Sequence, residues 1–212
     1  MKKKKNIGVI IFVSVCIIFT VACIIVQFFI KQDMKELDKE GEKFESMITE
    51  TANGTEIETQ YIHIEDDKFF VKVPKNFIQL DAETINKKYQ GDVPNVVFSS
   101  EDTKINVAIN QTDVAMSNDQ VLEYRKEFES IYKNSAEILE TDYYEVNEHN
   151  VGKIRMVSQA VDTKIYNNSI FFSYEDKLII VTFNCTEDLR SEWEEVGNFI
   201  IDSLFFGDDN DE

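Results

Sequence analysis

The sequence has little cysteine and little histidine, and both shortages limit what the protein can be. Of its three cysteines, Cys16 and Cys23 lie within the first 30 residues and only Cys185 follows them. A single cysteine cannot form an internal disulfide, so the chain after residue 30 has to fold on a hydrophobic core. The two histidines, His63 and His149, stand more than 80 positions apart. We expect a cross-strand histidine and a histidine in a polar turn, with a shared metal site as the alternative.

The sequence motifs of catalysis and phosphate binding are also missing. The chain contains no G-x-S-x-G, H-E-x-x-H or C-x-x-C motif and no glycine-rich phosphate loop. Cys185 precedes an expected helix, where a thiolate is stabilised, but the sequence provides no obvious base for it, so we expect a packed cysteine. We therefore assign no catalytic residue, no metal ligand and no cofactor, and we predict that the protein is not an enzyme.

Positive charge is scarce after residue 30. All 40 acidic residues but only 18 of the 22 basic residues lie there, which gives this portion a formal net charge of −22. Such a surface argues against a nucleic-acid partner, because phosphate contacts require Lys and Arg, and it disfavours lying flat on anionic lipid. The last residues, 207–212, include four acids but lack the spacing and central glycine of a calcium loop. We expect a solvated acidic tail there.

One long apolar run is present, over residues 7–30, and it contains no charged residue. As a helix rising about 1.5 Å per residue, it is long enough to cross the roughly 30 Å hydrocarbon core of a bilayer. Four lysines precede it, and positive charge stays in the cytoplasm, so residues 1–6 are predicted to be a cytoplasmic tail and everything after the anchor extracytoplasmic. A lipoprotein is the alternative, because TVAC, ending at Cys23, resembles a bacterial lipobox. The apolar run continues past Cys23, however, which favours an uncleaved, single-pass anchor.

Residues 31–56 are predicted to form a stalk and linker. Met34, Leu37, Phe44 and Ile48 stand at heptad-like positions in a segment rich in Lys and Glu. Two heptads favour a solvated stalk helix and leave a weak dimer seam as the alternative. The Asn53-Gly54 pair that follows is a strong turn signal, typical of a linker into a folded domain.

From residue 57 the apolar residues recur with period two, which predicts strands. The expected strands are IETQYIHIE, KFFVKVP, VVFSS, KINVAINQ, AEILETDYYEV, KIRMVSQAV, KIYNNSIFFSY and LIIVTFNC. The last of these is apolar on both faces, which predicts a central strand covered on both sides. One short helix is expected near residues 82–89.

Two longer helices interrupt and end this series of strands. Ser117 and Gln120 form a capping-box pair at the start of the first helix. Thr186 can cap the second. Their apolar stripes are expected at Val121, Tyr124, Phe128 and Ile131 in the first, and at Leu189, Trp193, Val196, Ile200 and Leu204 in the second. The sequence therefore predicts an antiparallel sheet with one helix inserted midway and one at the end.

Several of these segments resemble the family that joins the PsbP oxygen-evolving protein, the Ran-binding protein Mog1 and many uncharacterised bacterial exported proteins. The resemblance is carried by FFVKVPKNF, INVAIN, Gly152, and FFSYEDKLIIVTFNC running into a helix that ends in IIDSLFF. It covers residues 57–206 and implies an α+β fold, a three-layer α/β/α sandwich with a central antiparallel sheet. The membrane anchor departs from both named members and resembles the anchored bacterial branch.

These observations predict a non-catalytic, membrane-anchored extracytoplasmic domain that binds a protein partner, as an accessory part of a bacterial envelope complex. The alternatives are an extracytoplasmic carrier of a small ligand or metal, a lipoprotein, or an enzyme. Four asparagines fit the glycosylation pattern N-x-S/T, namely Asn53, Asn110, Asn167 and Asn184. The Lys-, Ile- and Asn-rich composition indicates a bacterium, where this pattern carries little meaning.

Overall fold

The computed structural model of the chain describes residues 47–64, 68–89 and 93–207. The expected cytoplasmic tail, the anchor at 7–30 with Cys23, and the acids from residue 208 onward lie outside these ranges. In the described part, no helix is both long and apolar enough to span a membrane.

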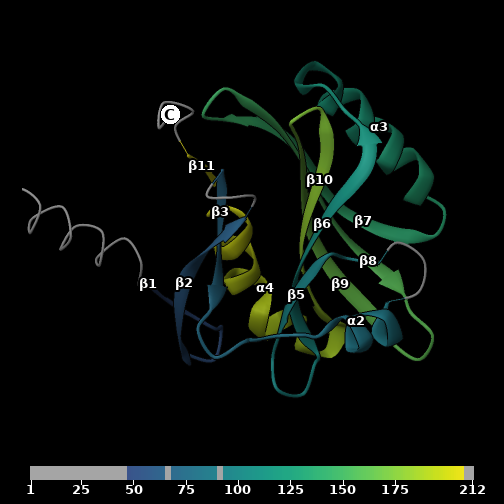
Figure 1. Cartoon of the computed structure of the whole chain (residues 1–212). Coiled ribbons are helices and arrows are strands. Elements are labelled where there is room, and N and C mark those ends of the chain that lie inside the picture. The colour runs from purple at the N-terminus through teal and green to yellow at the C-terminus, as the bar shows by residue number, and fades with distance from the viewer. Residues whose placement is uncertain (1–46, 65–67, 90–92, 208–212) are drawn as a thin grey trace, which may run out of the picture. The chain divides into compact units, whose positions relative to one another are not determined.

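The larger of two antiparallel sheets has seven strands in the order β4-β5-β6-β10-β9-β8-β7 (Figure 1). Strands β7 to β10 follow one another along the chain as a meander. Residues 147–148 and 175–176, which have positive φ, form the two turns at one end of the meander. The strand bounds are β4 (Ile78–Gln79), β5 (Val96–Ser99), β6 (Ile105–Ala115), β7 (Ala136–Val146), β8 (His149–Gln159), β9 (Lys164–Tyr174) and β10 (Lys177–Thr186).

A smaller sheet has the order β1-β2-β3-β11 and joins both ends of the described chain. Its strands are β1 (Met47–Glu50), β2 (Glu56–Ile64), β3 (Phe69–Pro74) and β11 (Phe205–Phe206). The prediction of a stalk and linker is wrong for residues 47–56, because β1 pairs with β2. Asn53-Gly54 closes this hairpin: Gly54 has a φ of 84°, and the Asn53 side chain accepts hydrogen bonds from Thr55.

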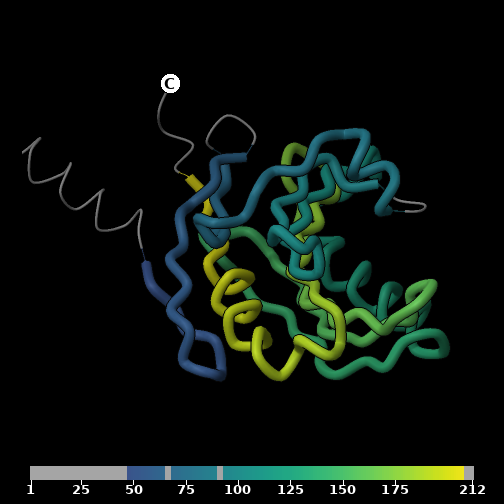
Figure 2. Tube along the Cα trace, turned by 90° about the horizontal axis from the view of Figure 1, so that it is seen from below, coloured from purple at the N-terminus to yellow at the C-terminus, as the bar shows by residue number. Residues whose placement is uncertain are grey.

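Helices cover both faces of the large sheet. The helices are α2 (Ala82–Lys88), a 3-10 turn at Asn118–Gln120 that leads into α3 (Val121–Tyr132), and α4 (Glu187–Ile201). Helix α3 packs on β7, β8 and β9, whereas α4 packs on the opposite face of β9 and β10 and also contacts β1 and β3. Figure 2 shows α4 and the small sheet on one side of the large sheet and α3 on the other. The predicted α/β/α layers are present, and the small sheet is an addition to them.

Strand β10 occupies the middle of the large sheet and is buried on both faces, as predicted. Ile179, Val181 and Phe183 join the main core under α4. On the other face, Leu178 packs with Ile154 under α3. This second face turns polar farther along the strand, and that change creates the site described below.

Three helix predictions meet different outcomes. The capping box of Ser117 and Gln120 is confirmed. The stripe on α3 fails at Ile131, which is 69% exposed. At about 100° per residue, Ile131 lies about 80° around the axis from the buried Val121. Helix α4 ends at Ile201, so the FF of IIDSLFF extends the small sheet instead of the helix.

Candidate functional site

An open cleft of about 820 Å³ lies on the face of the large sheet that α2 and α3 share. Helix α2 covers Val97 and Ala108 on this face, and α3 covers Ile154 and Phe171. The cleft lies beside the end of α2, over the ends of β6, β10, β9 and β8. It is lined by Lys88, Tyr89, Thr103, Lys104, Asn106, Ser158, Ala160, Asp162, Thr163, Ile165, Asn167, Asn184, Thr186 and Asp188.

The floor of the cleft is a row of asparagines on adjacent strands. Asn106 on β6 pairs in register with Asn184 on β10, and Asn184 pairs with Asn167 on β9. Directly opposite residues in an antiparallel sheet place their side chains on one face about 5 Å apart. One step along the strands, Ser169 and Thr182 share a hydrogen bond of 2.8 Å. The register therefore gathers amide and hydroxyl groups at one place.

Hydrogen bonds fix the orientation of these amides. Asn106 Nδ2 donates to the Thr103 carbonyl (3.4 Å) and to Asn184 Oδ1 (2.9 Å), and Asn106 Oδ1 accepts from Ser99 Oγ (2.7 Å). A carbonyl can only accept, so Nδ2 of Asn106 has to face Thr103 and the oxygen of Asn184 has to face Asn106. The Nδ2 donor of Asn184 is left on the side away from this bond.

The neighbouring Asn167 is held in the opposite sense. Its Nδ2 donates to the Ile165 carbonyl (3.1 Å) and to Ser158 Oγ (3.0 Å). Its Oδ1 accepts no hydrogen bond from the residues in the described ranges. The cleft floor thus offers an amide donor on β10 next to an amide acceptor on β9.

Two further polar groups in the cleft wall lack partners. The hydroxyls of Tyr89 and Thr186 are buried and make no hydrogen bond of ordinary geometry within the described part of the chain. Burial raises the pKa of Tyr89, and the side chain of Asn184, which approaches the Tyr89 hydroxyl as a hydrogen-bond partner, acts in the opposite direction. Leaving a buried hydroxyl unpaired costs roughly 1–3 kcal/mol. Unpaired buried hydroxyls are therefore more typical of binding sites than of packed cores.

A second candidate surface is an aromatic row on the outer face of the small sheet. His63, Phe70 and Phe205 are directly opposite one another on β2, β3 and β11. The Phe70 ring centroid lies 4.9 Å from His63 and 6.0 Å from Phe205, and Tyr61 joins at 6.5 Å. We call these four rings the aromatic row. Phe205 is 41% exposed although it is apolar.

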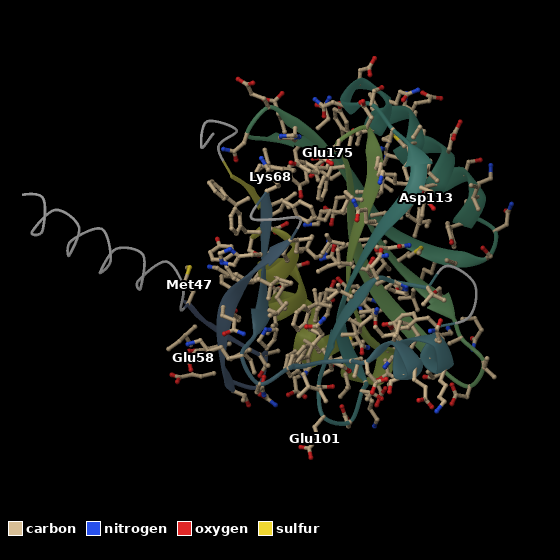
Figure 3. The ribbon with its side chains drawn as sticks, viewed as in Figure 1. Met47, Glu58, Lys68, Glu101, Asp113 and Glu175 are labelled. Carbon is tan, nitrogen blue, oxygen red and sulfur yellow. The ribbon has the colours of Figure 1, made fainter. Side chains whose placement is uncertain are left out.

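Lys72 lies beside the aromatic row and is almost fully buried, at 3% exposure. Its ammonium lies 4.9 Å from the ring centroids of both Tyr61 and Phe199. Such cation–π contacts offset part of the cost of burying the charge. Burial nevertheless lowers the pKa of Lys72. Figure 3 shows the neighbouring Met47 and Glu58 at the outer margin of this sheet.

Cys185 is a packed core residue, as predicted, and is fully buried under α4. The expectation that the helix N-terminus stabilises its thiolate is wrong. Burial, followed by the nearby Glu187 and Asp188, raises the pKa of the Cys185 thiol to about 12. The thiol therefore stays protonated at neutral pH.

The other residues considered from the sequence lie apart from one another. His63 is on the outer face of the small sheet, and His149 opens β8 and stacks at 3.9 Å on Phe206, whose ring faces the core. Within the described ranges, no three His, Cys, Asp or Glu residues are grouped to hold a metal. Asn167 and Asn184, noted only for the N-x-S/T pattern, prove to line the cleft. The sequence carries no local signal for Asn184, because the adjacent residues on the same face of β10, Thr182 and Thr186, are themselves polar.

Comparison with known proteins gives likeness in fold at low identity. No protein-family model matches the sequence, and no curated protein matches it either. Cyanobacterial PsbP (CyanoP) from Synechocystis sp. PCC 6803 is 14% identical and covers 70% of this chain and 92% of its own, with a TM-score of 0.49. The Saccharomyces cerevisiae Ran-binding protein Mog1p is 12% identical (71% and 96% covered, TM-score 0.45). LpqN of Mycobacterium tuberculosis, involved in cell envelope biogenesis, is 9% identical (72% and 92%, TM-score 0.46).

Proposed function

We propose that this protein is a non-catalytic binding domain, held outside the cell membrane by residues 7–30, and that it binds a protein partner as an accessory part of a bacterial envelope complex. The observation that supports it best is the aromatic row on the outer face of the small sheet. The partner would contact Tyr61, His63, Phe70 and Phe205.

The composition and setting of this surface suit a protein interface. Aromatic side chains are enriched among the residues that dominate binding energy, because they bury large rigid areas at a low entropy cost. Here three of them lie in register on three strands, so the sheet holds them in place before a partner arrives. A preorganised surface loses less freedom on binding.

Attachment to the membrane also favours a protein partner. A domain attached to a bilayer searches a thin layer, so its effective concentration near other membrane proteins is high and modest affinity suffices. The portion after residue 30 carries a formal net charge of −22, so a partner with a basic rim would associate faster at low salt.

Site-specific crosslinking in intact cells tests the proposal. A photoreactive phenylalanine in place of Phe205 is expected to capture one specific protein. The same group in place of Ile131, which is exposed on α3, serves as the matched control and should not capture it. Phe70→Ala should weaken the association about fivefold or more, because truncating a central anchor costs more than about 1 kcal/mol. Identical captured proteins at both positions, or none at either, would contradict the proposal.

A second candidate function is that of an extracytoplasmic carrier of a small polar ligand. The specific observation in its favour is the cleft, whose unpaired amide and hydroxyl groups are not used by the fold. The two functions use different surfaces and can be separated by experiment.

A further inference from the structure

We propose that the cleft on the large sheet is a binding site for a short peptide with free ends, distinct from the surface that contacts the protein partner. The inference comes from three observations on the cleft itself: a complementary pair of amide groups on its floor, opposite charges on its two sides, and its size.

The first observation is the complementary pair on adjacent strands. Asn184 presents an N–H donor, and Asn167, its register partner, presents a carbonyl acceptor. A peptide group carries one C=O and one N–H and satisfies both at once. The carbonyl of the bound peptide would accept from Asn184 Nδ2, and an N–H would donate to Asn167 Oδ1. A carboxylate alone has no donor for Asn167.

The amides are held for this task by the strands and by backbone carbonyls. Asn184 is fixed through Asn106 and the Thr103 carbonyl, and Asn167 is fixed by the Ile165 carbonyl. If Asn184 turned over, its Nδ2 would face the Nδ2 donor of Asn106, and if Asn167 turned over, its oxygen would face the Ile165 carbonyl. The pattern of donor and acceptor therefore has a fixed direction across the sheet.

The second observation is that the charges around the cleft follow the same direction. Lys104 precedes β6, beside the donor, and Asp162 follows β8, beyond the acceptor. The strand order β6-β10-β9-β8 puts these two side chains on opposite sides of the asparagine pair. Within the described ranges, no ion pair occupies the Lys104 ammonium or the Asp162 carboxylate. A peptide would therefore place its carboxylate toward Lys104 and its ammonium toward Asp162.

Two more charged residues line the cleft. Lys88, at the end of α2, donates to the Thr103 carbonyl and helps to hold the wall beside the donor. Asp188, in the first turn of α4, adds a second carboxylate to the lining.

The third observation is the volume of about 820 Å³, which lies within the range of sites that hold small molecules, about 300–1,000 Å³.

Ligand-detected saturation-transfer NMR on the full chain in detergent micelles tests the site, with trialanine as the probe. Trialanine is expected to give a saturable response. N-acetyl-trialanine amide, which lacks both terminal charges, should bind about fivefold more weakly, because each exposed ion pair contributes up to about 1 kcal/mol. Propionamide, a single small amide without charged ends, should not compete with trialanine at the same concentration.

Single substitutions test whether trialanine binds in the cleft. Asn184→Ala and Asn167→Ala should each weaken trialanine binding about three- to tenfold, which corresponds to one hydrogen bond. Lys104→Gln should weaken trialanine but leave trialanine amide unchanged, because the amide has no carboxylate for the lysine. Gln60→Ala removes an exposed amide on β2 and is the matched control, expected to bind as the wild type does.

Several outcomes would overturn this inference. They are no saturable response from trialanine, an equal response from the doubly capped peptide or from propionamide, and equal binding by both asparagine variants and the control. The comparison of capped and free peptide needs only the wild-type chain, so it stands even where a variant folds poorly. Crosslinking at Phe205 is independent of all these results, so failure here would leave the proposed protein partner unaffected.

Discussion

Replacing Gly152 by alanine should destabilise the domain, although alanine is the better residue for a regular strand. Gly152 lies on β8 directly opposite Phe171 on β9. A Cβ added there would lie 2.7 Å from Phe171 Cζ and 2.9 Å from Cδ2, inside van der Waals contact. The ring covers the glycine and fills the space that a side chain would need.

The Phe171 ring has little freedom to move. It is 1% exposed, and its centroid lies 5.2 Å from Tyr124 and 5.8 Å from Phe128, both on α3. Overpacking a well-filled core costs about 1–3 kcal/mol. Removing a glycine from a strand returns about 0.5–1 kcal/mol. The net expectation is a loss of about 1 kcal/mol and a fall of roughly 2–4 °C in Tm for a domain of this size.

Urea unfolding of residues 46–212, followed by far-ultraviolet circular dichroism, measures this change. The control is Phe171→Leu, which removes the ring. In that background Gly152→Ala should stabilise the domain by about 0.5–1 kcal/mol, because only the strand preference remains. If Gly152→Ala stabilises the wild-type domain as well, the Phe171 ring does not disfavour a side chain at position 152, and the reasoning is refuted.

Four further measurements test the fold and the predicted topology. The fragment 46–212 should unfold in one cooperative thermal transition, and 55–206, which lacks β1, should melt at a lower temperature; equal midpoints would show that β1 adds nothing. Cys185→Ser should cost roughly 1–3 kcal/mol by placing a hydroxyl in an apolar core. Because the folded thiol has a pKa of about 12 against an ordinary 9.0, the wild type should lose stability relative to Cys185→Ala as pH rises from 9 to 12, and parallel curves would contradict this. External protease should digest residues 31–212 on intact, wall-stripped cells. Full protection of these residues would show that the predicted orientation is wrong.

Much of the fold could be predicted from local patterns. The period-two segments became β2 and β3 of the small sheet and most strands of the large sheet, and β10 is central because its apolar residues occupy both faces. The capping box of Ser117 and Gln120 also formed as expected. These features depend on residues close together in the sequence, whose spacing alone sets the face that they occupy.

The errors and omissions involve pairings between distant segments. Nothing in MITE indicates a strand until Glu56–Ile64 is there to pair with it, and Phe205–Phe206 becomes β11 only beside β3. The cleft was missed for the same reason. Asn106, Asn167 and Asn184 are unremarkable in sequence and become a site through the register of three strands.

The order of strands in the small sheet has a consequence for when its outer face is complete. Strand β11 is the last of the described elements, yet it pairs with β3, which is among the first. During synthesis, β1, β2 and β3 are made early, but the row His63, Phe70 and Phe205 stays incomplete until β11 has been made. A prematurely ended chain would thus keep the strands of the large sheet while lacking the third position of the row. The small sheet thereby couples completion of this aromatic surface to completion of the domain.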